Sequence, residues 1–512
     1  MRAEFRSTPL PPPPPGFNMA AHVLRHASAQ PDKLALQIVR PTGAERWSYA
    51  RLEAAVRGAG AGLLARGLAP GDRVLLRLGN TPEFPVAFLG AIAAGLVPVP
   101  TSSQLTAEEI TKMAADLDPA LVIAGAGIAL PDHPAPVLTE AALRGFEALA
   151  PCDYALGDPE RLAYLVFTSG SSGRPRAVAH AHRAIWARQM MYQGWYGLGP
   201  EDRLLHAGAF NWTYTLGTGL MDPWAMGASA LIPGAGVDPA QIPLLLKRFD
   251  ATIFAAAPGV YRQILKHHTR LHLPRLRHGL SAGEKLPELT RAHWTEASGT
   301  PIYEALGMSE CSTFISGAPG HPVPPGASGY PQEGRRIAVL DVEGAVLDRG
   351  EAGTLAVHGA DPGLFLGYWN APEETAARFL GEWFVTGDTV SMAEDGAITY
   401  LGRDDDMMNA GGFRVSPLEV EATMAGCPGA GELAAIELRV SEEASVIALA
   451  YTGPATPEAL AAHAGAHLAR YKQPRIFAPL PALPRNANGK IDRRALRRDW
   501  PLREKDQPHD AP

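Results

Sequence analysis

The sequence has few cysteines, a modest share of charged residues and no long uninterrupted apolar run. Only three of its 512 residues are cysteines, and Cys152, Cys311 and Cys427 lie far apart, without the spacing of a metal site or a redox pair. We therefore expect reduced thiols and a cytoplasmic location. The formal net charge is -7, which repels rather than gathers nucleic acid, so we expect no nucleic-acid partner.

The longest apolar stretch is too broken to predict a membrane span. It reads FPVAFLGAIAAGLVPVP from Phe84 to Pro100 and contains three prolines and two glycines. This pattern favours a buried helix that runs into a strand. The N-terminal segment MRAEFRSTPLPPPPPG lacks the apolar core of a targeting signal, and its proline run is typical of a polyproline II tail.

Helix-like and strand-like segments alternate along most of the chain, which predicts an α/β fold with parallel-type sheets covered by helices. Arg51 to Leu68 has helical spacing of apolar residues, and Asp72 to Leu78 resembles a short strand; further strand-like runs lie at 162–167, 229–232 and 252–256. From about Glu351, short strands broken by glycines indicate a β-rich subdomain.

A chain of this length exceeds one hydrophobic core, so we expect at least two domains. After Gly402 the pattern becomes helix (417–425), strands (432–440 and 445–451) and helix (457–470), which predicts a small α+β domain. We divide the chain into a proline-rich tail (1–16), a large multi-subdomain N-terminal domain (17–402), a small C-terminal domain (403–505) and a short tail (506–512).

The strongest local signal is the segment YLVFTSGSSGRPRAV, from Tyr164 to Val178. An apolar strand enters a loop with two glycines, four hydroxyl side chains and two arginines. Glycines allow backbone amides to face an anion, and the hydroxyls and cations add donors, so the loop suits a triphosphate. It lacks the Gly-Lys-Ser/Thr ending of a Walker A loop, and a Gly/Ser loop alone is also typical of a flexible turn.

The same segment resembles the phosphate-binding signature of the adenylate-forming (AMP-binding) superfamily, which includes acyl-CoA synthetases, luciferases and nonribosomal peptide adenylation domains. The matching nucleotide-binding residues are Thr168, Ser169, Gly170, Ser171, Ser172 and Gly173. The family usually has lysine at the position of Arg176, and arginine keeps the charge with a different geometry. The resemblance therefore implies that Arg176 contacts a phosphate during catalysis.

Further motifs follow in the family's order across almost the whole chain. SAGEKLP, starting at Ser281, resembles the segment beside adenine, and YEALGMSE, from Tyr303, resembles the motif that ends in a hydroxyl and a glutamate. Ser309 is then implied to contact the α-phosphate, and Glu310 is the implied Mg²⁺ ligand. The nucleotide-binding residues implied by these two motifs are Gly283, Glu284, Leu306, Gly307 and Met308.

The C-terminal motifs complete the resemblance. WFVTGD and the following GRDDD imply that Asp388 and Arg403 bind the nucleotide and that Asp405 is a hinge. Taken alone, the aspartate run is typical of a solvated turn. Gly411 and Gly412 are implied to line the coenzyme A channel. PRNANGKI carries Lys490, the implied adenylation lysine, on a C-terminal domain that is mobile in this family.

The resemblance implies an AMP-forming acyl-CoA synthetase, an acid–thiol ligase that uses ATP, Mg²⁺ and coenzyme A. The segments SAGEKLP and GLMDPWAMGASALI are most similar in sequence to those of benzoate-type and medium-chain ligases. The expected acid is therefore aromatic or short to medium in length. The implied acyl pocket consists of Trp212, Tyr214, Ala257, Pro258 and Met308, although these aromatic residues are equally typical of ordinary core. The sequence leaves open which acid is used and whether the chain forms a homodimer.

Two alternatives remain. One is an adenylating enzyme that loads a carrier-protein thiol instead of coenzyme A, although no carrier domain follows Lys490. The other is a serine hydrolase, because Gly279 to Gly283 fits the G-x-S-x-G pattern around Ser281. That pattern requires histidine and acidic partners in space, and the adenine-side motif already accounts for Ser281.

Overall fold

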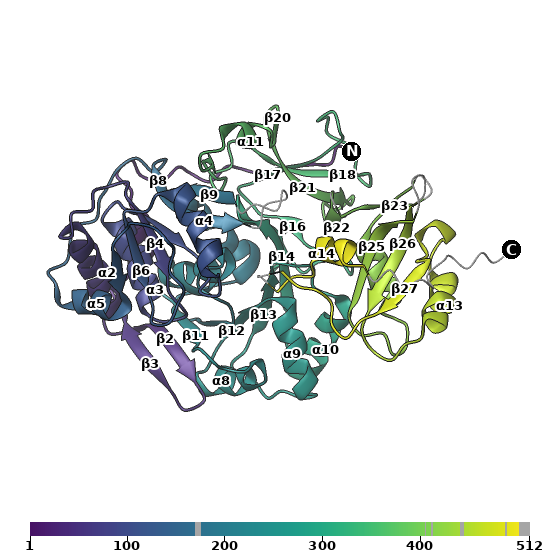
Figure 1. The fold of residues 1–512 in the computed structure, drawn as a ribbon, viewed down its shortest axis with the longest axis horizontal. Helices are drawn as coiled ribbons and strands as arrows, with labels where there is room; N and C mark the ends of the chain where they lie inside the picture. Colours follow the sequence, from purple (N-terminus) through teal and green to yellow (C-terminus); the bar gives the residue numbers. More distant parts are fainter. Residues whose placement is uncertain (169–175, 405, 411–412, 441–444, 487–488, 501–512) are drawn as a thin grey trace. The chain divides into compact units, whose positions relative to one another are not determined.

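The structure is a computed structural model that describes residues 1–168, 176–404, 406–410, 413–440, 445–486 and 489–500. The chain forms two compact units (Figure 1). The larger unit, mainly N-terminal, comprises residues 5–337 and 357–384. The smaller unit comprises residues 1–4, 338–356 and 385–512 and contains the C-terminal part of the chain.

A nine-stranded sheet organises the larger unit, in the order β16-β15-β14-β13-β12-β10-β11-β2-β3. Strands β14, β13, β12, β10, β11 and β2 are parallel to their neighbours, while β3, β15 and β16 are antiparallel. The strands are β2 (Leu34–Arg40), β3 (Gly43–Ser48), β10 (Arg203–His206), β11 (Ser229–Pro233), β12 (Ile253–Ala256), β13 (His278–Ala282), β14 (Ile302–Met308), β15 (Ser312–Ser316) and β16 (Tyr330–Pro331).

Both faces of this sheet are buried, because successive side chains of a strand point to opposite faces. Leu205 and Phe254 pack with α8 (Ile242–Arg248), α9 (Pro258–His267) and α10 (Glu288–Ser298). Their neighbours Leu204 and Ile253 pack with aromatic residues of η2 (Tyr192–Tyr196) and with α7 (Asp222–Ala225). The connection between η2 and α7 includes the π-helical segment η3 (Thr215–Met221).

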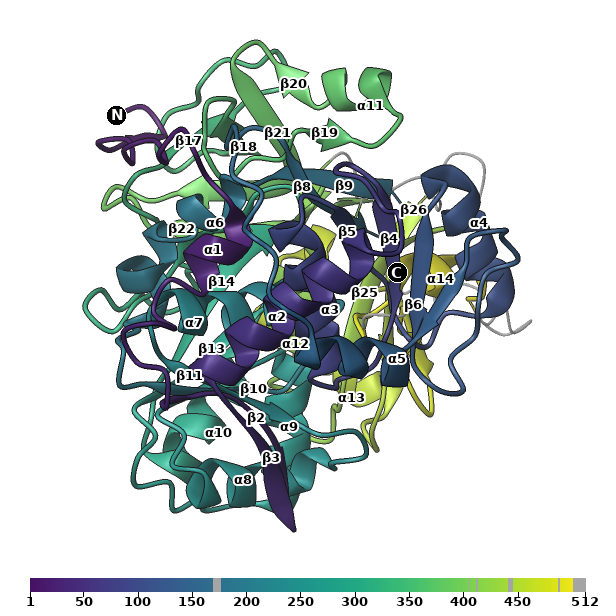
Figure 2. The same ribbon diagram turned by 90° about the vertical axis from the view of Figure 1, so that its left-hand side faces the viewer.

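A second, four-stranded parallel sheet lies beside a closely packed helix pair (Figure 2). Its order is β5 (Val97–Pro100), β4 (Arg73–Arg77), β6 (Leu121–Ala124) and β7 (Val137–Thr139), with α4 (Ala107–Leu117) and α5 (Glu140–Arg144). Helix α2 (Tyr49–Leu64) approaches α3 (Glu83–Ala93) so closely that a β-carbon on Gly90 would lie 2.8 Å from the carbonyl oxygen of Val56. A β-carbon on Gly60 of α2 would likewise lie 3.0 Å from the carbonyl oxygen of Gly90, so small residues on both helices serve packing.

A three-stranded antiparallel sheet completes the larger unit. It has the order β19 (Gly367–Tyr368), β9 (Arg176–Ala181) and β8 (Leu162–Thr168). The short helices α1 (Met19–Val23), α6 (Ala184–Ala187) and α11 (Pro372–Ala376) belong to the same unit.

The chain passes between the two units at four points, all inside strands of a six-stranded sheet. The sheet order is β1-β17-β18-β21-β20, with β22 paired to β21. The strands are β1 (Glu4–Arg6), β17 (Arg336–Leu340), β18 (Ala352–His358), β20 (Phe379–Leu380), β21 (Trp383–Met392) and β22 (Ile398–Arg403). The N-terminal segment expected as a proline-rich tail thus begins with a strand that the sequence did not predict.

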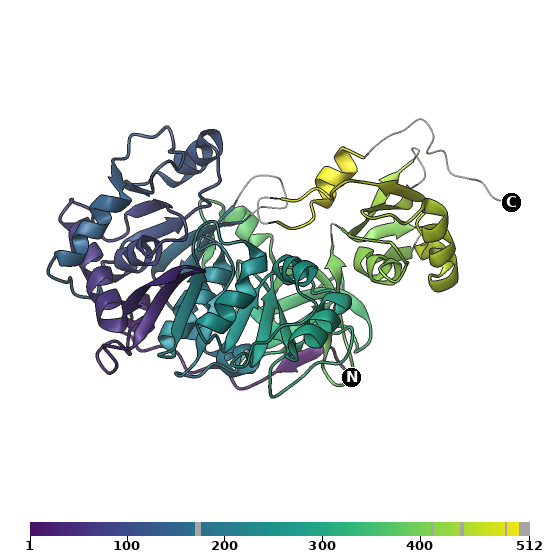
Figure 3. The ribbon, with the colours of Figure 1, turned by 90° about the horizontal axis from the view of Figure 1, so that it is seen from below.

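The remainder of the smaller unit is α+β (Figure 3). The sheet β25 (Leu433–Arg439), β26 (Ser445–Tyr451) and β27 (Ile476–Pro479) packs one face on α12 (Pro417–Met424) and α13 (Pro457–His467). Its other face packs on α14 (Arg493–Arg498) and Trp500. A two-stranded ribbon, β23 (Met408–Ala410) and β24 (Phe413–Val415), precedes α12.

The predicted fold class is confirmed: the chain is α/β, with several sheets, a large N-terminal domain and a smaller C-terminal one. The apolar stretch at 84–100 is the predicted buried helix followed by a strand, α3 and β5. Within the described ranges, no helix combines the length and apolar character needed to cross a bilayer.

Candidate active site

The carboxyl ends of the parallel strands bring several predicted residues to one edge of the large sheet. β12 leads into Ala257 and Pro258, β13 into Gly283 and Glu284, and β14 into Ser309 and Glu310. In an open α/β sheet this edge is where ligands bind. Residues implied to contact adenine, phosphate and acid, which are far apart in sequence, are therefore clustered by the topology.

The expected phosphate loop connects two antiparallel strands, β8 and β9, whose facing residues are Thr168 and Arg176. Residues Ser169 to Gly173 lie outside the part of the chain that the structure describes. Arg176 Nε lies 2.5 Å from Glu374 Oε2 on α11. This pair orients the Arg176 side chain and partly neutralises its charge.

Ser309 and Glu310 occupy a tight turn between β14 and β15. The Glu310 side chain is largely buried, and its Oε1 accepts a 2.7 Å hydrogen bond from the Tyr368 hydroxyl. The backbone oxygen of Glu310 accepts another hydrogen bond, from Phe365 N at 2.7 Å. The carboxylate is therefore held in one orientation while it retains acceptor capacity for a cation.

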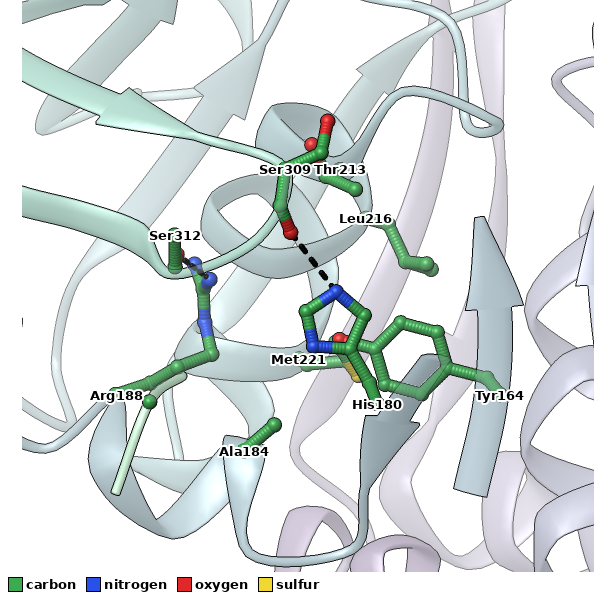
Figure 4. A pocket seen from close by; sticks show the side chains of 10 residues that line it. Tyr164, His180, Ala184, Arg188, Thr213, Leu216, Met221, Ser309 and Ser312 are labelled. Atoms are coloured by element: carbon green, nitrogen blue, oxygen red, sulfur yellow. Dashed lines mark hydrogen bonds between the residues drawn. The ribbon is translucent and has the colours of Figure 1, made fainter. Parts of the chain in front are cut away.

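A small cavity of about 20 Å³ lies beneath this turn (Figure 4). Its volume is roughly that needed for one water molecule. His180 of β9 lies against the ring of Tyr164, with ring centroids 4.8 Å apart, and its Nε2 is 2.8 Å from the Ser309 carbonyl oxygen. Burial lowers the pKa of His180 to about 4, so the ring is neutral and Nε2–H donates to this carbonyl.

Of the two predicted acyl-pocket aromatics, Trp212 contacts the adenine-side segment, whereas Tyr214 is buried in the core and its hydroxyl donates to the Leu280 carbonyl at 3.2 Å. The rings of Trp212 and Tyr214 are perpendicular, with centroids 5.2 Å apart. Gly283 has a φ of +98°, and a β-carbon there would lie 2.6 Å from Trp212 Cζ2. Only glycine satisfies both the backbone conformation and this approach. Trp212 therefore packs directly on the segment that follows β13.

Ser281 has no surroundings that would activate it as a nucleophile. It is fully buried in β13, and among the described residues its Oγ has no hydrogen-bond partner. A hydrolase serine needs a histidine base within hydrogen-bond reach. The structure therefore disfavours the serine hydrolase alternative.

The smaller unit carries the remaining predicted residues that can be placed. Asp388 of β21 faces Arg403 of β22 in the sheet register, and Arg403 Nη1 lies 3.5 Å from Asp388 Oδ1. Lys490 lies on a loop where Asn486 N donates to the Lys490 carbonyl at 2.9 Å and Lys490 N donates to Asn486 Oδ1 at 3.1 Å. Asp405, Gly411 and Gly412 lie outside the described residues.

Glu310 offers a metal ion a single carboxylate. Over the described residues, no group of three or more histidine, cysteine, aspartate or glutamate side chains could hold a metal ion. Mg²⁺ differs from Zn²⁺ in needing only one or two carboxylates beside substrate phosphates. The oriented carboxylate of Glu310 fits that requirement.

Sequence reasoning missed the side chains that hold the Ser309–Glu310 turn. His180 and Tyr368 contact it from β9 and β19, at separations of 129 and 58 residues. In the sequence only His180 stands out, because it is a histidine in a mostly apolar strand, four residues after Arg176. Tyr368 carried no local signal.

The chain is similar to proteins of one enzyme family along most of its length. A family profile described as "AMP-binding enzyme" matches residues 23–369. The 3-hydroxybenzoate–CoA ligase of Aromatoleum sp. (strain CIB) is 31% identical over 89% of this chain and 92% of its own length. The benzoate–CoA ligase of Thauera aromatica is 32% identical over 84% and 86%. A crystal structure of an anthranilate CoA ligase in complex with anthranoyl-AMP superposes with a TM-score of 0.87 and 27% identity, covering 95% of this chain and 98% of that one.

Proposed function

Because this chain belongs to the AMP-binding enzyme family, we propose that it uses ATP to join an aromatic carboxylic acid to the thiol of coenzyme A. The proposed acid is a benzoate or a ring-substituted benzoate. Three similar proteins act on benzoate, 3-hydroxybenzoate and anthranilate, which are all acids of this class.

The observation that carries the proposal is the position of Trp212 on Gly283. Trp212 thereby lies at the sheet edge that also carries Ser309 and Glu310. A flat ring packs well against perpendicular aromatic side chains. An acid bound there would have its carboxylate near the groups proposed to hold the nucleotide, which is the arrangement that adenylation requires.

In the proposed first step, a carboxylate oxygen attacks the α-phosphorus of ATP. The bond to the β-phosphate oxygen breaks, and pyrophosphate leaves with its electron pair. The residues proposed to hold the phosphates are Ser309, Arg176 and the loop from Thr168 to Gly173, while Lys490 would bridge carboxylate and phosphate oxygens. Asp388 would accept hydrogen bonds from the ribose hydroxyls. In the second step the thiol of coenzyme A attacks the acyl carbon, AMP leaves, and the thiol proton is lost.

Glu310 is the residue proposed to hold Mg²⁺, which when bound spreads the negative charge of the phosphates. We expect Glu310→Gln to raise the Mg²⁺ concentration for half-maximal AMP formation roughly tenfold, because an amide oxygen carries no full charge. Gln can still accept the Tyr368 hydrogen bond, so the turn is retained. The measurement is a Mg²⁺ titration of AMP release.

Tyr368→Phe is the matched control for this substitution. It removes the hydroxyl that orients Glu310 but keeps the carboxylate, so its Mg²⁺ requirement should change less than that of Glu310→Gln. An unchanged Mg²⁺ requirement in Glu310→Gln would contradict the role assigned to this residue.

The proposed function is tested by a substrate panel with purified protein, ATP, Mg²⁺ and coenzyme A. The acids are benzoate, its three hydroxy isomers, 2-aminobenzoate, butyrate and octanoate. We expect AMP and an acyl-CoA in equal amounts with at least one aromatic acid, and little with the aliphatic ones. Acyl-CoA is identified by mass spectrometry.

The panel also separates the alternatives. Acid-dependent ATP–pyrophosphate exchange without any acyl-CoA would indicate a different thiol acceptor, such as a carrier protein. Preference for octanoate would contradict the aromatic assignment while leaving the reaction type intact. Ester hydrolysis in the absence of ATP would favour the hydrolase, and the loss of that activity in Ser281→Ala would confirm it.

A further inference from the structure

The turn that carries Ser309 and Glu310 includes a strained residue. Ser312 has a φ of +63°, in the left-handed region that non-glycine residues rarely occupy. The β14–β15 register also shifts between Leu306 and Gly307. Strain of this kind persists only where the surroundings fix the backbone. Other groups must therefore hold the turn in place.

One such group is the guanidinium of Arg188, the residue that immediately follows α6. Arg188 Nη1 donates a short hydrogen bond to Ser312 Oγ, as Figure 4 shows. Its Nε and Nη2 lie 2.8 Å and 2.6 Å from the two carboxylate oxygens of Asp222. The Asp222 side chain is fully buried, and that of Arg188 is 9% exposed. The bidentate pair locks the guanidinium plane.

Two hydroxyls complete this network. The Tyr196 hydroxyl donates to Asp222 Oδ2 at 2.7 Å, and Tyr196 and Thr218 hydroxyls are 2.9 Å apart. Arg188 Nη2 lies 3.2 Å from the Tyr196 oxygen. Burial would lower the pKa of Arg188, but the Asp222 carboxylate outweighs that effect, so the pKa lies above its ordinary value and the charge is retained.

The two ends of the turn are thus held from different elements. His180 of β9 holds the Ser309 carbonyl, and Arg188 holds the Ser312 hydroxyl. Cys311, between them, is fully buried and cannot shift without opening the core. Glu310 is left with its side chain directed by Tyr368. A displacement at Ser312 would therefore be transmitted to Glu310 through two peptide units and to Ser309 through three.

We propose that Arg188, fixed by Asp222, is a positioning residue that holds Ser309 and Glu310 in place for MgATP. The proposal rests on the assignment of these two residues to the nucleotide. Every guanidinium nitrogen of Arg188 contacts a protein oxygen, so we assign it a role in positioning and no contact with substrate. Its effect should appear in MgATP affinity rather than in the affinity for the acid.

The test replaces the whole pair, Arg188→Met with Asp222→Leu. Exchange of a buried ion pair for apolar residues of similar size is often neutral for stability. Removal of only one partner is destabilising, because it leaves a buried charge without its counter-ion. We expect a melting temperature close to that of the unmodified protein. The dissociation constant for MgATP, from calorimetry, should rise roughly tenfold or more, because small displacements of binding groups have large effects. The KM for MgATP should rise in parallel and the KM for the acid should not.

Two further variants keep the result interpretable. Ser312→Ala removes the hydroxyl that Arg188 contacts but leaves the ion pair, so it should weaken MgATP binding in the same direction. Lys112→Met removes an exposed ion pair with Glu108, 2.7 Å apart on α4, and should leave MgATP binding unchanged. MgATP affinity equal to that of the unmodified protein in both the double variant and Ser312→Ala would overturn the proposal.

The binding readout also separates this proposal from the proposed function. Absence of acyl-CoA with every acid would contradict the ligase reaction, yet calorimetry with MgATP alone would still compare the variants. If the double variant is unstable, Ser312→Ala decides: weaker binding supports the positioning role, and unchanged binding overturns it.

Discussion

Lys490→Ala should slow acyl-CoA formation roughly a hundredfold or more, because loss of a preorganised charge contact in a transition state typically costs on the order of 3 kcal/mol. In the proposed mechanism Lys490 acts only in the first step, where carboxylate and α-phosphate, both negatively charged, must come together. The substitution should therefore abolish most ATP–pyrophosphate exchange. Transfer from supplied acyl-AMP to coenzyme A should proceed at nearly the rate of the unmodified protein.

Lys472→Ala is the matched control for this prediction. Lys472 belongs to the same unit and pairs with Glu419, but it lies outside the proposed site. Exposed ion pairs contribute little to stability, so this variant should keep both half-reactions. Lys490→Arg tests geometry, since it keeps the charge in a planar, longer group. Equal slowing of both half-reactions by Lys490→Ala would contradict the assignment of this lysine to adenylation.

The sequence predicted those parts of the fold that depend on local pattern. Apolar runs such as Leu162 to Phe167 and Thr252 to Ala256 became β8 and β12, and the glycine-rich helix at 51–68 became α2, shifted by a few residues. These elements are determined by periodicity and turn residues within the segment itself. Strand β1 was missed, because Glu4–Arg6 has no strand pattern and forms one only by pairing with β17, more than 330 residues away.

The candidate site divides in the same way. Motifs in contiguous segments predicted Ser309 and Glu310, whereas Trp212 and Tyr214 were predicted only from their position relative to those motifs. The groups that hold them could not be found from the chain alone: Arg188 and Asp222 are 34 residues apart, and neither segment indicates an ion pair. The fully buried pair of Arg335 and Asp361, which contacts this turn through Cys311 Sγ, had no sequence signal either.

Acidification from pH 7 to pH 5 should strongly destabilise the folded protein through four buried histidines of the larger unit. Burial lowers the pKa of His182 and His206 to about 3 and that of His180 and His278 to about 4, from an ordinary value of 6.5. Below pH 6.5 these histidines are therefore protonated in the unfolded chain. In the folded chain they stay neutral until the pH approaches their lowered pKa values. Each histidine then contributes stability that is complete above pH 6.5 and decreases by about 1.4 kcal/mol per pH unit as the pH falls.

Four such groups together would remove up to about 8 kcal/mol by pH 5, a large fraction of the 5 to 15 kcal/mol of a typical folded domain. Urea unfolding at pH 7, 6 and 5, followed by tryptophan fluorescence, measures this change. His206→Asn should flatten the dependence, because both ring nitrogens of His206 are buried without a hydrogen-bond partner among the described residues and protonation there is unfavourable. His267→Asn is the control, since that side chain is exposed on α9. A free energy of unfolding that stays constant from pH 7 to pH 5 would show that these histidines are protonated or solvated in the folded protein.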